Sequence, residues 1–219
     1  MWEHGDLLKI IEGNMLISFS QANNVLLPYM PELCSLIHGA WNDYQVQISS
    51  NVQAILSTRS RASIVHDFMV KRAIEFAEGK NNVSFIRRKR MFVLIFKSEY
   101  GFLALRFKKR DKGGFSQNIP TKQVSDFKNQ IPIHGIDVKH HLEIGYILTD
   151  MQDVISSIVM VCPSGGAIYW MAEITPAGSR ENVVNLWEHK GEEEQSGDGF
   201  VVRPRKVDDN DKDATTDSN

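Results

Sequence analysis

Residues 91–108 read MFVLIFKSEYGFLALRFK, and this stretch decides the fold. Residues 91–96 form a continuous apolar run, short enough to be a buried strand. Residues 98–101 supply a turn, and residues 102–108 then alternate between apolar and mixed positions, as a half-buried strand does. One face of this second strand carries Leu103, Leu105 and Phe107, and the other carries Phe102, Ala104, Arg106 and Lys108. The stretch therefore predicts two neighbouring strands.

The segments around this pair predict helices and more strands. Residues 60–78 have apolar side chains at helical spacing, with Ser60 as a possible N-cap and Gly79 at the end. A second helix is predicted over residues 121–130, with Thr121 as its cap. Three further strands are predicted at residues 144–149, 155–161 and 167–174. This order of elements predicts an α+β fold with a largely antiparallel sheet and packed helices.

Residues 1–50 predict a mixed α/β region that packs on an α+β core at residues 51–190. Asp6 is placed to cap a short helix, and a second helix is predicted to begin at Pro31 and to end at Gly39. The alternation over residues 44–48 predicts a strand.

The last part of the chain, residues 191–219, predicts a disordered acidic tail. It holds nine acidic and four basic residues, and it contains too little apolar surface to offset the entropy of ordering. The formal net charge of −2 therefore divides into −5 for the tail and +3 for the remainder. The near-neutral net charge of the whole chain therefore hides a positive net charge on residues 1–190.

The composition places limits on the class of protein. We find no run of about 18 apolar residues and no basic region before an apolar stretch at the N-terminus, which predicts a cytoplasmic protein with no membrane contact. The two cysteines, Cys34 and Cys162, cannot form a disulfide framework or a four-thiolate zinc site.

Basic residues are concentrated near the predicted strand pair. Between Arg87 and Lys112 there are ten lysines and arginines but only two acids. If the strands pair, we expect the two basic clusters to lie near the two ends of one ribbon. Such cations suit phosphate groups, since each neutralised phosphate releases counterions; the alternative is a solvated sheet edge blunted by charge. The predicted nucleic-acid-binding residues are Arg87, Arg88, Lys89, Arg90, Arg106, Lys108, Lys109 and Arg110.

The residue triplet at positions 106–108 argues against a metal-dependent nuclease. A helix followed by a hairpin and another helix resembles the restriction-endonuclease-like core, which needs an acid-x-Lys triplet to hold a divalent cation. Here the second strand offers Arg106-Phe107-Lys108, and an arginine at a ligand position repels a cation. The comparison therefore supports at most an inactive relative of that core.

Phosphate chemistry without a metal is also possible. His66 is the candidate base, because the usual pKa of histidine lies near neutrality. Arg61 and Asn118 are further catalytic candidates, although the sequence does not show that these side chains meet. His66 also has a simpler interpretation as a structural histidine, and Asn118 has one as part of a polar loop before a helix cap.

The histidines do not predict a metal site. His134, His140 and His141 fit no standard zinc spacing, and no cysteine lies close to them. On a strand His140 and His141 would point to opposite faces. We therefore predict neither a metal nor a cofactor.

Several short motifs resemble a group of uncharacterised bacterial proteins. The motifs are Ser60-Arg61-Ala62-Ser63 with His66, Arg106-Phe107-Lys108-Lys109, Gln117-Asn118-Ile119-Pro120-Thr121 with Gln123, and Gly145-Tyr146. Members of that group are encoded in mobile elements beside helix-turn-helix regulators with zinc-peptidase domains. The resemblance covers roughly residues 60–174 and implies a toxin–antitoxin or phage-defence setting, but no mechanism.

Two functions remain open on this basis. The first is a nucleic-acid-binding or nucleic-acid-processing protein of a bacterial or phage conflict system, motivated by the basic segment. The second is a non-enzymatic interaction module, such as an antitoxin, an inhibitor or a regulatory subunit, that binds a cognate protein partner. It is motivated by the lack of any complete catalytic motif.

Overall fold

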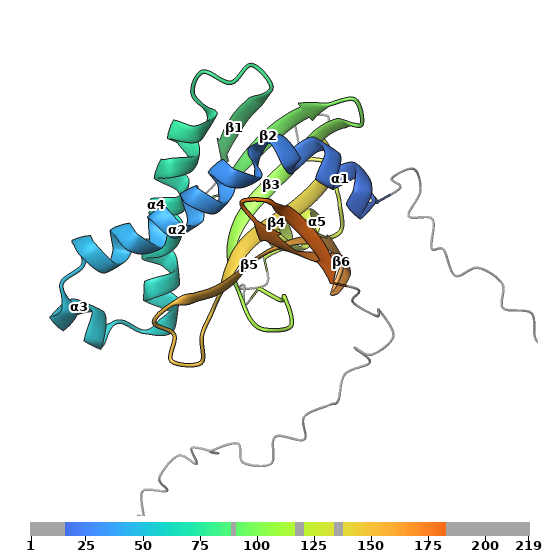
Figure 1. The fold of residues 1–219 in the computed structure, drawn as a ribbon. Coiled ribbons are helices and arrows are strands. Elements are labelled where there is room, and N and C mark those ends of the chain that lie inside the picture. The colour runs from blue at the N-terminus through green and yellow to red at the C-terminus, as the bar shows by residue number, and fades with distance from the viewer. Residues whose placement is uncertain (1–15, 89–90, 117–120, 134–137, 183–219) are drawn as a thin grey trace, which may run out of the picture. The chain divides into compact units, whose positions relative to one another are not determined.

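The computed structural model describes residues 16–88, 91–116, 121–133 and 138–182, and all of these residues belong to one compact unit (Figure 1). The acidic tail predicted at residues 191–219 lies outside the described residues, as does the helix predicted after Asp6. The helices are α1 (Phe19–Leu26), a 3-10 turn (Leu27–Tyr29), α2 (Met30–Gln47), α3 (Ser50–Ile55), α4 (Thr58–Ala77) and α5 (Lys122–Lys128). The strands are β1 (Val83–Arg88), β2 (Met91–Ser98), β3 (Gly101–Arg110), β4 (Val138–Leu148), β5 (Ile155–Ser164), β6 (Ala167–Thr175) and β7 (Gly178–Asn182).

The strands form one seven-stranded sheet in the order of the chain, β1 to β7. Every pair of neighbours is antiparallel except β3 and β4, which are parallel and are joined through the segment that contains α5. A parallel pair needs such a crossover, because the chain must return to the end of the sheet where the first strand began. The prediction of an α+β fold with a largely antiparallel sheet is confirmed.

The sheet has helices on both faces. The predicted apolar face of β3, formed by Leu103, Leu105 and Phe107, is buried in the main core with the helices α2 and α4. The opposite face packs on α5, where Phe127 lies in a smaller cluster with Val93 and other residues of β2. The alternation in residues 102–108 therefore separates a helix-covered core from a second face that carries charge.

The prediction of a strand at residues 44–48 is wrong. Residues 30–47 form the single helix α2, and Tyr44 is buried as part of its apolar stripe. The helix also continues past Gly39, where the guanidinium of Arg72 occupies the space that a side chain would need. Arg72 in turn donates two hydrogen bonds to Asp43, of 2.6 and 2.9 Å. Packing against α4 thus overrides a local alternation and a local stop signal.

The helix predicted from Ser60 begins slightly earlier than expected. In α4 the N-cap is Ser57, whose hydroxyl accepts from the Ser60 amide, and Gly79 follows the helix with a φ of +76°. The predicted cap of α5 is confirmed, since the Thr121 hydroxyl accepts from the amide of Val124. The earlier start of α4 matters for the site, because it brings Arg59 onto the first turn of the helix.

Candidate functional site

The strands β2 and β3 separate at one end. Their pairing runs from Ser98–Gly101 to Leu94–Leu105, and beyond that point β2 pairs only with β1 while β3 pairs only with β4. In an antiparallel pair the start of the first strand lies beside the end of the second. The described part of the first basic cluster therefore adjoins the same end as the second cluster, and the prediction that the clusters lie at two ends of a ribbon is wrong.

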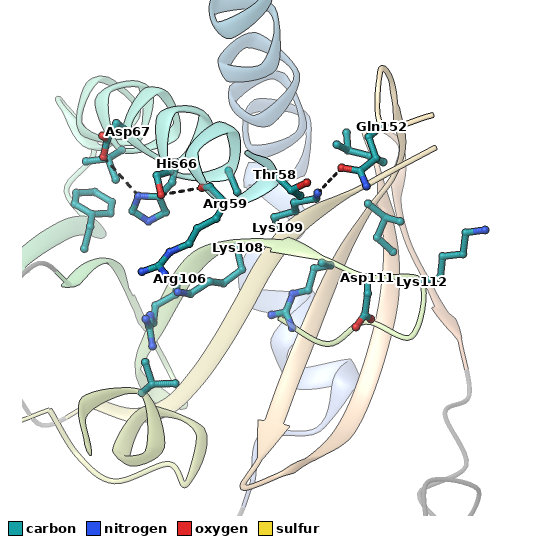
Figure 2. Close-up of a pocket in the computed structure, with 18 of the residues that line it drawn as sticks. Thr58, Arg59, His66, Asp67, Arg106, Lys108, Lys109, Asp111, Lys112 and Gln152 are labelled. Carbon is teal, nitrogen blue, oxygen red and sulfur yellow. Dashed lines mark hydrogen bonds and ion pairs between the residues drawn. The ribbon is translucent and has the colours of Figure 1, made fainter. Parts of the chain in front are cut away.

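A cleft of about 1170 Å³ opens at this end of the sheet (Figure 2). Its walls come from the first half of α4, from the β1–β2 hairpin, from Val124 of α5 and from the turn after β4, and the end of β3 forms its floor. The cationic residues that line it are Arg59, Arg87, Arg106, Lys108, Lys109, Arg110 and Lys112. The acidic residues are Asp67, Asp111 and Asp150. Among the described residues, positive charge therefore predominates in the cleft.

The cleft brings together most of the predicted binding residues. Five of them line it: Arg87, Arg106, Lys108, Lys109 and Arg110. The side chains of Arg88, Lys89 and Arg90 lie outside the described residues.

The three catalytic candidates do not converge. His66 lines the cleft, with its Nδ1 3.8 Å from Asp67 Oδ1. Arg61 instead donates from Nη1 to the carbonyl oxygen of Gln152 at 2.8 Å, which holds the β4–β5 turn against α4. Asn118 lies outside the described residues. Burial, followed by the nearby charge of Lys108, keeps the pKa of His66 below its usual value, so its imidazole is neutral at pH 7.

Arg106 occupies the floor of the cleft and is 7% exposed. Its guanidinium carbon lies 4.6 Å from the centre of the Phe127 ring, a cation–π contact that fixes the plane of the group. Its Nη1 is buried and has no hydrogen-bond partner among the described residues. Burial lowers the pKa of Arg106, while Glu143 acts in the opposite direction.

Lys108 lies two residues further along the same face of β3. Burial, followed by the nearby charge of Arg106, lowers its pKa to about 8. A lysine with this pKa gains or loses its charge near neutral pH, and it is sensitive to any anion that enters the cleft.

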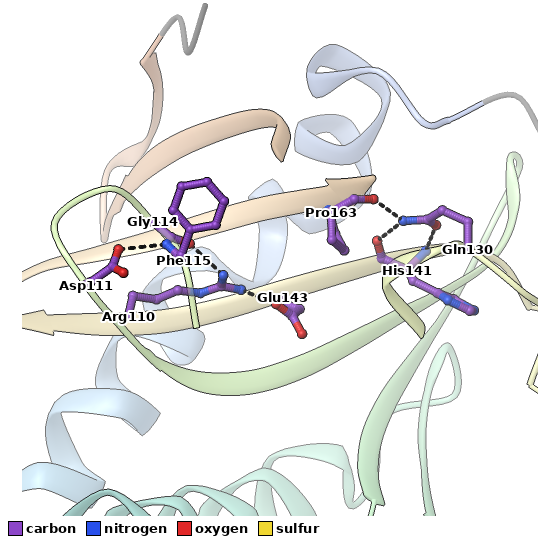
Figure 3. A network of polar contacts seen from close by, with 8 residues as sticks. All are labelled: Arg110, Asp111, Gly114, Phe115, Gln130, His141, Glu143 and Pro163. Atoms are coloured by element: carbon purple, nitrogen blue, oxygen red, sulfur yellow. Dashed lines mark hydrogen bonds and ion pairs between the residues drawn. The ribbon is translucent and has the colours of Figure 1, made fainter. Parts of the chain in front are cut away.

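Arg110 is held by a buried network that the sequence did not reveal (Figure 3). Its Nη2 lies 2.7 Å from Glu143 Oε2, and its Nη1 donates to the carbonyl oxygen of Gly114 at 2.7 Å. Burial alone would raise the pKa of Glu143, but Arg110, Arg106 and Lys108 together hold that pKa below its usual value. Arg110 thus organises the floor of the cleft through an ion pair, and Glu143 remains ionised.

A second buried network fixes the other end of this face (Figure 3). The Gln130 amide donates to the carbonyl oxygens of His141 and Pro163, and it accepts from the His141 amide at 2.7 Å. The His141 ring stacks on Phe127 with centroids 4.5 Å apart. His141 and the partly exposed His140 do not line the cleft, and the described residues contain no group of three His, Cys, Asp or Glu side chains placed to hold a metal. His134 lies outside the described residues.

The burial of His141 predicts a loss of stability in acid. Burial lowers the pKa of His141 to about 4, so the unfolded chain binds a proton more readily below about pH 6.5. Protonation therefore favours unfolding, and the contribution of this one group should fall by about 2 kcal/mol between pH 7 and pH 5. Urea unfolding of the wild type and of His141→Phe at both pH values measures this difference. An equal loss of stability in the two proteins would contradict it.

Sequence reasoning missed several residues of the cleft. Thr58, Arg59 and Ser63 lie on the first turns of α4, and the β4–β5 turn contributes Gln152, which accepts from Lys109 Nζ at 3.1 Å. Arg59 lies before the predicted start of the helix. Recognition of Ser57 as the N-cap would have placed it on the same helix as His66.

Comparisons with protein-family models, with curated proteins and with solved structures each found no match to this chain. Within the described residues, no helix is long and apolar enough to cross a membrane.

Proposed function

We propose that the protein binds nucleic acid in the cleft between α4 and the end of β3. The observation that carries this proposal is the depth of the cations. Arg106 is 7% exposed at the floor, whereas Arg59 and Arg87 are exposed along the walls. A slender polyanion can contact the exposed cations at the rim and also reach the buried cation at the floor. Each phosphate that is neutralised in this way releases counterions. The first turn of α4 adds backbone amides, which also favour phosphate.

The recessed cations favour a nucleic-acid strand over an acidic protein surface. A flat protein surface would reach the rim of the cleft but not a side chain as enclosed as Arg106. The alternative, a non-enzymatic module that binds a protein partner, therefore explains the exposed cations at the rim. It does not explain the buried cation at the floor. The resemblance to mobile-element proteins suggests a bacterial or phage conflict system as the setting. Processing of the bound strand stays a prediction, for which His66 is the candidate base inside the cleft.

We expect binding that weakens steeply with salt. Fluorescence anisotropy with labelled single-stranded and duplex DNA and RNA, across a range of salt concentrations, measures both the affinity and its salt slope. The double variant Arg59→Ala/Arg87→Ala should weaken binding on all sequences and should reduce the salt slope by about 2, one for each lost phosphate contact.

The matched control is Lys97→Ala. Lys97 is an exposed cation on β2 that pairs in register with Phe102, away from the cleft, so its loss should leave the affinity and the slope unchanged. If no nucleic acid binds at low salt, or if Lys97→Ala weakens binding as much as the double variant, the cleft is not the binding surface. Isolation of a stoichiometric acidic protein partner without nucleic acid would favour the alternative function.

A further inference from the structure

Arg106 is a buried arginine without a protein acceptor. It is 7% exposed, and among the described residues its guanidinium makes no hydrogen bond and no ion pair. By contrast, Arg110 on the same strand is also buried, but it donates to Glu143 and to the carbonyl oxygen of Gly114. Arginine is rarely buried unless it is paired, because its N–H groups lose their hydrogen bonds to water. The missing acceptor of Arg106 therefore requires an explanation.

The guanidinium of Arg106 is nevertheless held in place. Its carbon lies 4.6 Å from the centre of the Phe127 ring, and that ring also stacks on His141, with centroids 4.5 Å apart. The Phe127 carbonyl oxygen lies 3.0 Å from His141 Nδ1, a contact that ties this part of α5 to β4. A ring face attracts the charge of a guanidinium but accepts none of its in-plane hydrogen bonds. Arg106 is therefore fixed in position and still able to donate.

The enclosure of Arg106 costs the fold free energy. Burial lowers the pKa of Arg106, and the opposing attraction of Glu143 does not restore it. The charged guanidinium is therefore less favourable in the folded protein than in water, as expected of an incompletely compensated cation. Arg106 also lines the cleft, so a ligand that enters the cleft meets this side chain. An anion there would supply the missing acceptor and would recover part of the cost of burial.

We infer that Arg106 is an oxyanion receptor that donates to one phosphate group in the cleft, and that Phe127 is the positioning residue that fixes its guanidinium. A planar guanidinium can donate two parallel hydrogen bonds to two oxygens of one phosphate. Phosphodiesters and phosphomonoesters both offer such a pair of oxygens, so this chemistry recognises either. The inference rests on the proposed function, because it names the side chain that binds a backbone phosphate of the strand. Free phosphate shares the same chemistry.

The first test compares the binding of sulfate to the wild type, to Arg106→Met and to Lys97→Met. Sulfate is the probe because it is a tetrahedral oxyanion that does not titrate near neutral pH. Calorimetry at constant ionic strength should show sulfate binding to Arg106→Met roughly tenfold or more weakly, since a charge-assisted hydrogen bond is lost. Lys97→Met removes an exposed cation away from the cleft, and it should bind sulfate as the wild type does.

Urea unfolding of the same proteins gives a readout that distinguishes a receptor from a structural arginine. Without sulfate, the midpoint of Arg106→Met should be no lower than that of the wild type, because an apolar chain replaces an uncompensated cation. With sulfate at the same ionic strength, the midpoint should rise further in the wild type than in Arg106→Met, since a bound anion stabilises the folded state by mass action. The rise in Arg106→Met measures the general effect of sulfate on folding.

The role of Phe127 is tested with a labelled oligonucleotide by anisotropy. Arg106→Met should weaken binding roughly tenfold or more, and Phe127→Leu should weaken it roughly threefold while Arg106 is still present. If Phe127 acts through Arg106, Phe127→Leu should have no further effect on affinity in the Arg106→Met background. Equal losses of affinity in the two backgrounds would overturn the positioning role of Phe127.

The outcomes separate the receptor from the proposed function. Loss of oligonucleotide binding in Arg106→Met, with or without loss of sulfate binding, supports a site for backbone phosphate. Sulfate binding that depends on Arg106, without binding of any oligonucleotide, overturns the proposed function and leaves free phosphate as the ligand. If Arg106→Met changes neither sulfate nor oligonucleotide affinity, the receptor is overturned for both sources, while oligonucleotide binding with a normal salt slope leaves the proposed function intact. A lowered urea midpoint in that case would show that Arg106 serves folding alone.

Discussion

Replacing Glu143 by leucine should lower the free energy of unfolding by about 3–5 kcal/mol, because it leaves buried cations without their carboxylate. Glu143 is fully buried and pairs with Arg110 at 2.7 Å, and it also lies opposite Arg106 in the sheet register. Leucine fills a similar volume, so the loss reports the charge more than a cavity. Urea denaturation followed by circular dichroism at pH 7 measures the change.

Two further variants identify the cause of this loss. Glu143→Gln retains a hydrogen-bond acceptor for Arg110 but removes the charge, and it should fall between the wild type and Glu143→Leu. The double variant Glu143→Leu/Arg110→Met should recover part of the stability, because the paired cation is removed as well. A loss below about 1 kcal/mol in Glu143→Leu, or no recovery in the double variant, would contradict the role given to the pair.

Gly145→Ala is expected to be the second strongly destabilising change, with a loss of about 3 kcal/mol. A Cβ at Gly145 would collide with the backbone carbonyl of Lys108, its register partner on the parallel strand β3. A clash with backbone cannot be relieved by a change of rotamer, so β3 and β4 must move apart. The same movement would displace Lys108 and Arg106, and we therefore expect weaker nucleic-acid binding as well.

Gly166→Ala provides the matched control, since a Cβ there would meet nothing within 4 Å. Its stability should remain close to that of the wild type. Thermal unfolding of both variants, with binding measured below the transition, tests the two effects together. A Gly145→Ala protein as stable as Gly166→Ala would show that the strands tolerate a side chain at this contact.

The sequence predicted the parts of the fold that depend on local patterns. The alternation at Leu103, Leu105 and Phe107 and the cap at Thr121 are local signals, and both are confirmed. The strands β1 and β7 were not predicted. β1 is polar or exposed at several positions, among them Ser84, Phe85 and Arg87, and it relies on pairing with β2 for its conformation.

The site was harder to predict because it depends on contacts between distant residues. Arg106 and Arg110 are indistinguishable as letters in a basic run, yet only Arg110 pairs with Glu143, which lies 33 residues away. Likewise, the pairing of β2 with β3 ends at Leu94 and Leu105, although the apolar run continues before Leu94 and the alternation continues after Leu105. The sequence could therefore name most of the cations in the cleft, but not the arrangement that brings them together.

The separation of β2 from β3 also divides the selective constraints on these two strands. Each residue of β2 between Leu94 and Ser98 pairs with a residue of β3, so selection acts on mutations there through their effect on folding. Arg87 and Phe92 pair with each other, not with β3, and border the cleft, so an exposed position such as Arg87 can change with the proposed ligand without disturbing the β2–β3 pairing. Relatives of this protein that diversify under pressure from changing targets should accumulate substitutions in this hairpin first, while the paired half of the same strands stays constant.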